Sequence, residues 1–233
     1  MPETLADEVL AYAHYLDDQR ASRAVGEPAG TYAVGTQDAK LDTQKPVNVA
    51  SVPLRSPFRY PGGKTWLVPY IRMWLRGKKK RPALFVEPFA GGGICSLTVS
   101  FEKMADHALM AELDDNVAAV WKTLLTGQAE WLAARIRSFE CNLENVKKAL
   151  NVARAPENLS LKEKAFLTIL RNRVQRGGIM APGAGLVKSG ENGRGVASRW
   201  YPTTLARRIR EIDWNRDRMT FVDGDGMKLI EEY

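Results

Sequence analysis

An apolar run that ends in an acidic residue and a glycine loop, Ala83–Gly93 (ALFVEPFAGGG), constrains the fold of this chain more than any other stretch. Its first part, Ala83–Val86, has no polar residue, as expected for a strand that is buried on both faces of a parallel sheet. The loop opens a predicted helix over Ile94–Phe101, and a second apolar strand, His107–Ala111, ends at Glu112. Strand, loop, helix and strand in this order predict an α/β unit with a parallel sheet.

The rest of the chain is predicted to be mainly helical, with a third strand near its C-terminal end. Hydrophobic periodicity predicts helices over residues 3–20, 65–75, 117–125, 131–139, 142–175, 203–212 and from 227 onward. The third strand is expected at Met219–Val222, followed by Asp223-Gly224-Asp225-Gly226. Residues 177–198 are rich in glycine and poor in apolar side chains, so we expect a surface loop that lies on the helices or on a ligand.

Length and composition favour one α/β domain with an insertion. The 233 residues are 45% hydrophobic and 26% charged, as in ordinary globular proteins. We assign residues 1–57 to a linker-like arm, residues 58–127 with 216–233 to the α/β domain, and residues 128–215 to a helical insertion.

The sequence has neither a long apolar segment nor a cysteine and histidine pattern typical of metal sites. No apolar run approaches the roughly 18 residues of a membrane span, and the first residues are acidic, so we expect a cytoplasmic protein without a membrane partner. The two cysteines and two histidines have no metal-ligand spacing, and we expect no metal site.

Charge is distributed unevenly along the chain. Residues 1–54 hold eight acidic and four basic residues, a net charge of −4. Because the net charge of the whole chain is +7, residues 55–233 carry a net charge of +11. Residues 55–81 hold nine basic and no acidic residues, and residues 162–210 hold eleven basic and two acidic residues. Two separated basic blocks favour a polyanionic partner, because Lys and Arg contacts to phosphates release counterions. The run 76–81 (RGKKKR) is equally explained as a solvated turn.

Carboxylates follow each predicted strand, at Glu87, Glu112 and Asp225. The C-terminal ends of parallel strands line one edge of a sheet, so these residues and the glycine loop should converge there. Glu112 lies nineteen residues after Gly93, where a carboxylate can accept hydrogen bonds from ribose hydroxyls. A dinucleotide site is a competing interpretation, although its glycine turn usually begins directly at the strand end. Asp225 is also compatible with a simple Asp-Gly turn.

The segment Arg59–Thr65 (RYPGGKT) superficially resembles a phosphate-binding loop of nucleoside triphosphatases. That loop requires a glycine at the position of Phe58 and a preceding strand, and neither is present. We therefore reject this class. Lys64 remains available to neutralise a carboxylate, and Tyr60 to stack on a flat ring.

Taken together and in order, these segments resemble the motifs of Dam-like (D12 class) adenine-N6 DNA methyltransferases. The matching segments are Phe58–Lys64 (FRYPGGK), Phe85–Gly93 (FVEPFAGGG), Glu112–Asn116 (ELDDN), Arg171–Arg173 (RNR) and Phe221–Gly226 (FVDGDG). The resemblance covers roughly residues 57–233 and leaves the N-terminal arm outside. It implies a Rossmann-like sheet that binds S-adenosylmethionine, C-terminally incomplete in this chain, with a helical insertion that recognises double-stranded DNA.

The resemblance also implies roles for individual residues. Tyr60 and Lys64 would hold the methionine end of the cofactor above the Glu87–Gly93 loop, Glu112 its ribose and Asp225 its adenine. The full set of expected cofactor-binding residues is Tyr60, Gly62, Lys64, Glu87, Phe89, Gly91, Gly93, Glu112 and Asp225. The expected DNA-binding residues are Arg171, Asn172, Arg173 and Arg176.

Two departures from the family pattern limit what the resemblance implies. Residues 174–182 (VQRGGIMAP) differ from the Tyr-Asn-Gly version of better-known members, so no target sequence is carried over. The catalytic tetrapeptide [DN]-P-P-[YFW], whose ring stacks on a flipped base, occurs nowhere in these residues. We therefore expect either a fragment or one half of a split enzyme, whose complementary chain carries the tetrapeptide beside the first strand, or a catalytically inactive module that binds cofactor and DNA. An RNA-directed methyltransferase is a third alternative.

Overall fold

The computed structural model describes residues 49–59, 63–152, 159–178, 180 and 184–233. The chain divides into a compact unit, Val47–Leu229, and a second unit made of Met1–Pro46 with Ile230–Tyr233. The expected helix over residues 3–20 lies outside the described residues. In the described part of the chain, no helix is both long and apolar enough to cross a bilayer.

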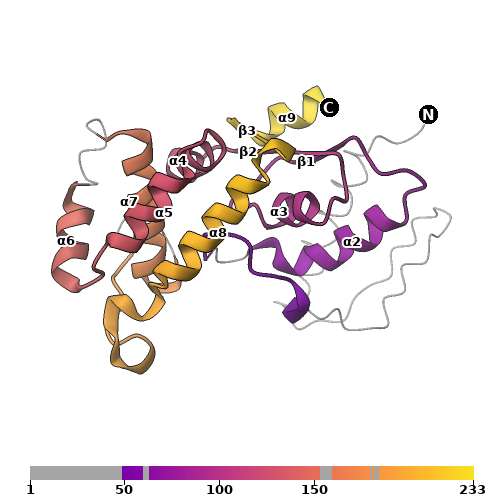
Figure 1. The fold of residues 1–233 in the computed structure, drawn as a ribbon. Helices are drawn as coiled ribbons and strands as arrows, with labels where there is room; N and C mark the ends of the chain where they lie inside the picture. Colours follow the sequence, from indigo (N-terminus) through magenta and orange to yellow (C-terminus); the bar gives the residue numbers. More distant parts are fainter. Residues whose placement is uncertain (1–48, 60–62, 153–158, 179, 181–183) are drawn as a thin grey trace, which may run out of the picture. The chain divides into compact units, whose positions relative to one another are not determined.

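A parallel sheet of three strands forms the centre of the larger unit (Figure 1). The strands are β1 (Leu84–Glu87), β2 (His107–Glu112) and β3 (Met219–Asp223), in the order β1-β2-β3. Leu84 is paired with His107, and Ala108 with Met219. The predicted mixed α/β fold with a parallel sheet is confirmed, and each strand agrees with its expected range to within a residue at either end.

One face of the sheet is covered by α3 (Ile94–Phe101) and α4 (Asp115–Leu125). Every second strand residue points to this face, so Phe85, Met110 and Met219 join the main hydrophobic core. Helix α3 has exactly the predicted bounds, since the glycines before it and the polar residues after it mark both ends.

The opposite face carries a much smaller cluster. Leu109 and Ala111 pack there with Leu229 of α9 (Gly226–Glu232), and the side chains of Leu84 and Val86 are only partly buried against them. Helix α9 lies on the other side of the sheet from α3 (Figure 1). Within the described residues, β1 pairs with β2 alone and is therefore an edge strand.

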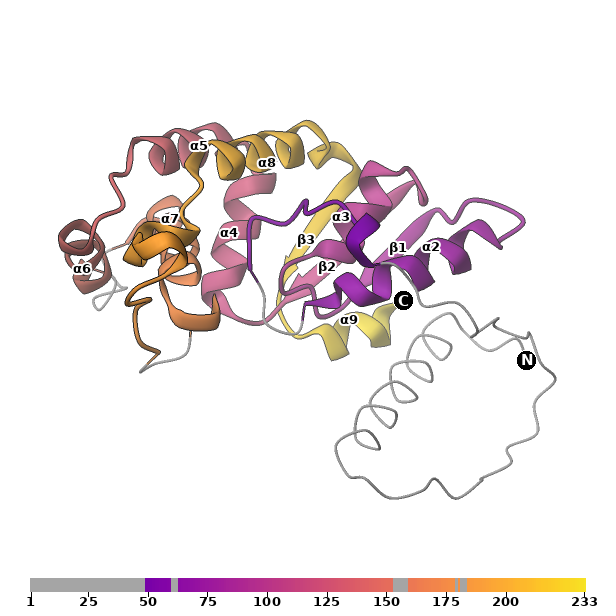
Figure 2. The same ribbon diagram turned by 90° about the horizontal axis from the view of Figure 1, so that it is seen from below.

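The helical region consists of α5 (Ala129–Ser138), α6 (Leu143–Val152), α7 (Leu161–Val174) and α8 (Pro202–Trp214). Helix α5 packs along α8 and α4 packs on α7 (Figure 2). Residues 142–175 are predicted to be wholly helical; α6 and α7 account for most of the described ones, but Leu159 and Ser160 are not helical, because α7 begins at its own capping box of Ser160 and Glu163. That Ser-x-x-Glu signal is visible in the sequence.

Short 3-10 turns and one further helix complete the unit. The turns are η1 (Val49–Ser51), η2 (Lys64–Leu67), η4 (Arg176–Gly178), η5 (Glu191–Gly193), η6 (Gly195–Arg199) and η7 (Arg216–Arg218), and the helix is α2 (Val68–Arg76). The described part of the glycine-rich stretch lies on the helices, as predicted. At its end, Trp200 is buried edge-on against Phe139 and Phe166.

Candidate functional site

The end of β1 is tied to the start of α3 by one buried carboxylate. Glu87 is 4% exposed, and its Oε2 accepts a hydrogen bond of 2.8 Å from the backbone N–H of Ser96. The residue at the helix N-cap, Gly93, has no side chain to accept such a bond. Glu87 therefore supplies from a neighbouring strand the negative group that a helix N-terminus favours.

Lys64 balances the charge of Glu87 and fastens the glycine loop. Its ammonium lies 2.9 Å from Glu87 Oε1 and also donates to the carbonyl oxygens of Phe89 and Ala90. Burial alone would lower the pKa of Lys64, but Glu87, Cys95 and Glu112 together outweigh it, and the pKa is raised. All three ammonium donors are thus engaged within the protein. Burial and Glu87 also raise the pKa of the adjacent Cys95 thiol, which stays protonated.

The glycine loop has a fixed backbone conformation. Gly91 and Gly93 have φ angles of 51° and 62°, which L side chains rarely adopt. A Cβ at Gly93 would lie 2.6 Å from the Trp121 ring, whose indole N–H donates to the Gly91 carbonyl at 2.9 Å. These two glycines therefore serve the packing of Trp121 beneath the loop. The N–H of Gly92 donates to no described group.

Glu112, at the end of β2, holds the loop from the other side. Its Oε2 accepts from the Gly91 N–H at 2.7 Å, and its Oε1 accepts from the N–H groups of Leu113 and Asp114, each at 3.0 Å. A carboxylate offers about four acceptor positions, and these bonds use three. Glu112 is thereby fixed in place with acceptor capacity remaining on Oε2.

Asp225 and Phe89 occupy different places at the same edge of the sheet. The Asp225 carboxylate accepts from the Met227 N–H at 2.9 Å and so caps α9. Its neighbour Gly224 donates to the Glu112 carbonyl at 3.1 Å, but Asp225 does not line the cavity described below. The Phe89 side chain is 54% exposed and does line it.

A cavity of about 780 Å³ opens at this edge of the sheet. One side, the glycine-loop wall, is formed by Lys64, Phe89–Ile94 and Glu112. The other side includes three arginines, Arg59, Arg173 and Arg208, which we call the arginine wall. The volume lies within the range of about 300–1,000 Å³ that is typical of small-molecule sites.

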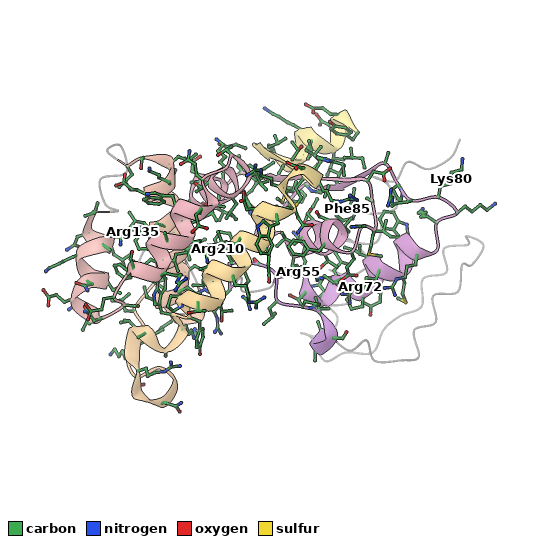
Figure 3. The ribbon with its side chains drawn as sticks, viewed as in Figure 1. Arg55, Arg72, Lys80, Phe85, Arg135 and Arg210 are labelled. Carbon is green, nitrogen blue, oxygen red and sulfur yellow. The ribbon has the colours of Figure 1, made fainter. Side chains whose placement is uncertain are left out.

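No described carboxylate forms an ion pair with an arginine of this wall, unlike Arg55 and Arg72 of the same unit. Arg55 and Arg72 lie beside α3 (Figure 3), and both pair with Glu102 at its C-terminal end. Arg173 is only 4% exposed, donates to the Pro57 carbonyl and has no acceptor for its Nε. Burial, with the nearby charges of Arg208 and Arg59, lowers the pKa of Arg173 to about 9.

Asn172 positions Arg59 at this wall. Its side chain is buried, accepts from the Arg59 N–H at 2.8 Å and donates to the Arg59 carbonyl at 3.0 Å and the Gly178 carbonyl at 2.9 Å. A Cβ at Gly178 would lie 2.5 Å from the Arg59 carbonyl oxygen. The side-chain amide of Asn172 therefore holds Arg59 against α7, although the two residues are 113 positions apart in the sequence.

The four residues expected to bind DNA therefore divide into two pairs. Asn172 and Arg173 are buried, and in this conformation their polar groups face the chain or the cavity. Arg171 is half-buried and Arg176 is exposed, so these two side chains are accessible to an external partner. Arg173 lines the cavity instead of the outer surface, and its expected contact with DNA stays a prediction.

The expected cofactor residues come together only in part. Lys64, Phe89, Gly91, Gly93 and Glu112 line the cavity, and Glu87 lies beneath Lys64. Tyr60 and Gly62 lie outside the described residues. Sequence reasoning did not identify Arg208 or the arginine wall, because the absence of acidic neighbours becomes visible only when distant segments are brought together.

Comparison of the sequence with protein-family profiles and with curated proteins gives no match. The chemistry of the site therefore has to be inferred from its own residues. Those residues offer a preorganised carboxylate acceptor at one wall and unpaired guanidinium donors at the other.

Proposed function

We propose that the cavity binds S-adenosylmethionine, and that this chain is the cofactor- and DNA-binding part of an adenine-N6 DNA methyltransferase. One observation carries the proposal. The glycine loop, Glu112 and Lys64 line one cavity at the C-terminal edge of a parallel sheet, which is where open α/β sheets bind nucleoside ligands. The order of the matching sequence motifs supports the same assignment.

The residues present fit such a cofactor. Glu112 has an acceptor position left for a ribose hydroxyl, and the Gly92 N–H is a donor without a described partner. Phe89 presents an exposed ring to the cavity, as a surface for stacking. Lys64 would act mainly by holding the loop, since its donors are already engaged. The bound cofactor would supply an electrophilic methyl group on a sulfonium.

DNA would be bound mainly through phosphate contacts. The 162–210 block contains exposed basic side chains outside the cavity, Arg176, Lys188, Arg194 and Arg207. Such contacts predict an affinity that falls steeply with salt. An affinity for duplex DNA that is insensitive to salt would contradict this part of the proposal.

Methyl transfer further requires the Pro-Pro tetrapeptide, which these 233 residues do not contain. We propose that a complementary chain provides it and pairs with the edge strand β1, whose Leu84 and Val86 are only partly buried. The second candidate is a module that binds cofactor and DNA without turnover, which the absence of the tetrapeptide favours. Co-expression with a chain carrying an Asp-Pro-Pro-Tyr strand separates the two, with N6-methyladenine measured by mass spectrometry.

Calorimetric titration with S-adenosylmethionine tests the cofactor assignment. The variant Glu112→Gln keeps the side-chain shape and removes the charge, so we expect binding roughly ten-fold or more weaker, from about 1.5–3 kcal/mol for a charged hydrogen bond. The control Glu130→Gln changes an exposed residue of α5 and should bind as the wild type does. Equal affinity in wild type and Glu112→Gln would exclude Glu112, and no binding by the wild type would exclude the cofactor.

A further inference from the structure

Two guanidinium groups that line the cavity, those of Arg173 and Arg208, have a buried donor without an acceptor. Arg173 and Arg208 each have a buried Nε that bonds no group of the described structure. Arg173 donates to the Pro57 carbonyl and Arg208 to the Ser56 carbonyl, and neither acceptor carries a formal charge. Arg59 lies close enough to Arg173 to lower its pKa. Like charges are therefore gathered around the buried Arg173, and no described carboxylate forms an ion pair with any of the three arginines; the charge of Glu211 acts on Arg208 only from a distance.

This arrangement is unfavourable for the protein alone. A buried charge that lacks a partner costs several kcal/mol, and proteins normally pair it or expose it. The same chain pairs Arg55 and Arg72 with Glu102, so acidic partners are used elsewhere in this unit. An uncompensated cluster that opens into a cavity is typical of a site for an anion.

We propose that the arginine wall is a phosphate-binding site, formed by Arg59, Arg173 and Arg208 and independent of the proposed cofactor. A carboxylate has two oxygens in one plane, and a single arginine fork satisfies it. Three guanidiniums held by separate segments suit a tetrahedral anion, whose oxygens accept from several directions. The phosphate could belong to a nucleic-acid backbone, as a diester, or to a nucleotide or free phosphate, as a monoester.

The positions of the three arginines are set by the fold. Arg173 is on α7 and Arg208 on α8, and Arg59 is clamped to α7 by Asn172. The side chains of Arg173 and Arg208, each bonded to a backbone carbonyl, therefore lose little further freedom when an anion binds. Preorganised donors of this kind bind anions more tightly than lysines on a flexible surface.

The test uses the full chain and measures unfolding temperature and calorimetric affinity at constant ionic strength. The ligands are inorganic phosphate, dimethyl phosphate as a diester and acetate as a carboxylate, each compared with chloride. We expect phosphate to raise the unfolding temperature, and its affinity to fall roughly ten- to hundred-fold in Arg173→Met and in Arg208→Gln. Arg216→Gln changes an exposed residue of η7 that pairs with Asp213 and does not line the cavity; it is the matched control and should behave as wild type.

The three ligands also distinguish the sources of the phosphate. An effect of dimethyl phosphate indicates a backbone diester, and an effect of inorganic phosphate alone indicates a monoester. The proposal is overturned if phosphate acts no differently from chloride, if acetate matches phosphate, or if the variants retain the full effect. Because no S-adenosylmethionine is present, these outcomes do not depend on the cofactor assignment.

Discussion

At the glycine-loop wall the buried charges of Glu87 and Lys64 form an ion pair, whereas no arginine of the arginine wall forms one with a described carboxylate. Glu87 bonds the Ser96 N–H and the Lys64 ammonium, and Glu112 bonds three backbone N–H groups. Arg173 has only a carbonyl oxygen and an unsatisfied Nε. The charged groups of the glycine-loop wall have their partners without a ligand, whereas the guanidinium groups of the arginine wall would gain negatively charged partners from a bound anion.

Because the two walls differ in charge pairing, removing a charge should affect the stability of the fold differently at each wall. Removing a charge from the glycine-loop wall leaves its partner buried and unpaired, and this destabilises the fold. Removing a charge from the arginine wall relieves repulsion and desolvation, and it should leave the ligand-free fold unharmed. Substitutions at the two walls are therefore expected to change stability in opposite directions.

The largest effect is expected for Glu87→Ala. It leaves the Lys64 ammonium without its carboxylate and the start of α3 without its acceptor, at a cost of about 3–5 kcal/mol in the free energy of unfolding. Chemical denaturation measures it. Glu144→Ala removes an exposed pair with Lys148 and should cost less than about 0.5 kcal/mol. Similar losses in the two variants would mean that Glu87 is not the buried centre of this wall.

A smaller effect is expected for Gly93→Ala, which tests the shape of the same wall. The added Cβ would meet the Trp121 ring at 2.6 Å in a backbone conformation unfavourable for alanine, so we expect a loss of about 2 kcal/mol. A Cβ at Gly185 meets no atom within 4 Å, and Gly185→Ala should be nearly neutral. Equal free energies of unfolding for Gly93→Ala and Gly185→Ala would mean that Gly93 is not packed closely against Trp121.

The smallest effect, and the one of opposite sign, is expected for Arg173→Met in the absence of ligand. Methionine fills the same space without a charge, which gains stability, and it loses the bond to the Pro57 carbonyl. We expect a net increase of about 1 kcal/mol in the free energy of unfolding in chloride buffer. A loss comparable to that of Glu87→Ala would show that Arg173 is compensated in the folded protein after all.

Local patterns predicted the sheet and the glycine-loop wall. The bounds of α3 and the strands follow from apolar runs and glycines that lie close together in sequence. The same kind of signal, the capping box of Ser160 and Glu163, marks the start of α7, although helical periodicity alone predicts helix on both sides of it. Local signals were therefore sufficient wherever a residue acts on its sequence neighbours.

The arginine wall could not be predicted in this way. Its arginines come from three segments, and the clamp between Asn172 and Arg59 spans 113 positions. In the sequence Arg173 is one basic residue among many, and basic residues are usually exposed. Burial and the lack of acidic neighbours, which distinguish it, are properties of the folded chain alone.

The most direct measurement of the central claim is photocrosslinking of S-adenosylmethionine, labelled in its methyl group, to the full chain, followed by peptide mapping after trypsin digestion. If the glycine-loop wall binds the cofactor, the label should be found in the peptides that contain Phe89–Ile94 and Glu112, residues 81–103 and 104–122. Excess unlabelled cofactor should remove it, and Glu112→Gln should reduce it. Label confined to other peptides, or resistant to competition, would contradict the assignment of this cavity.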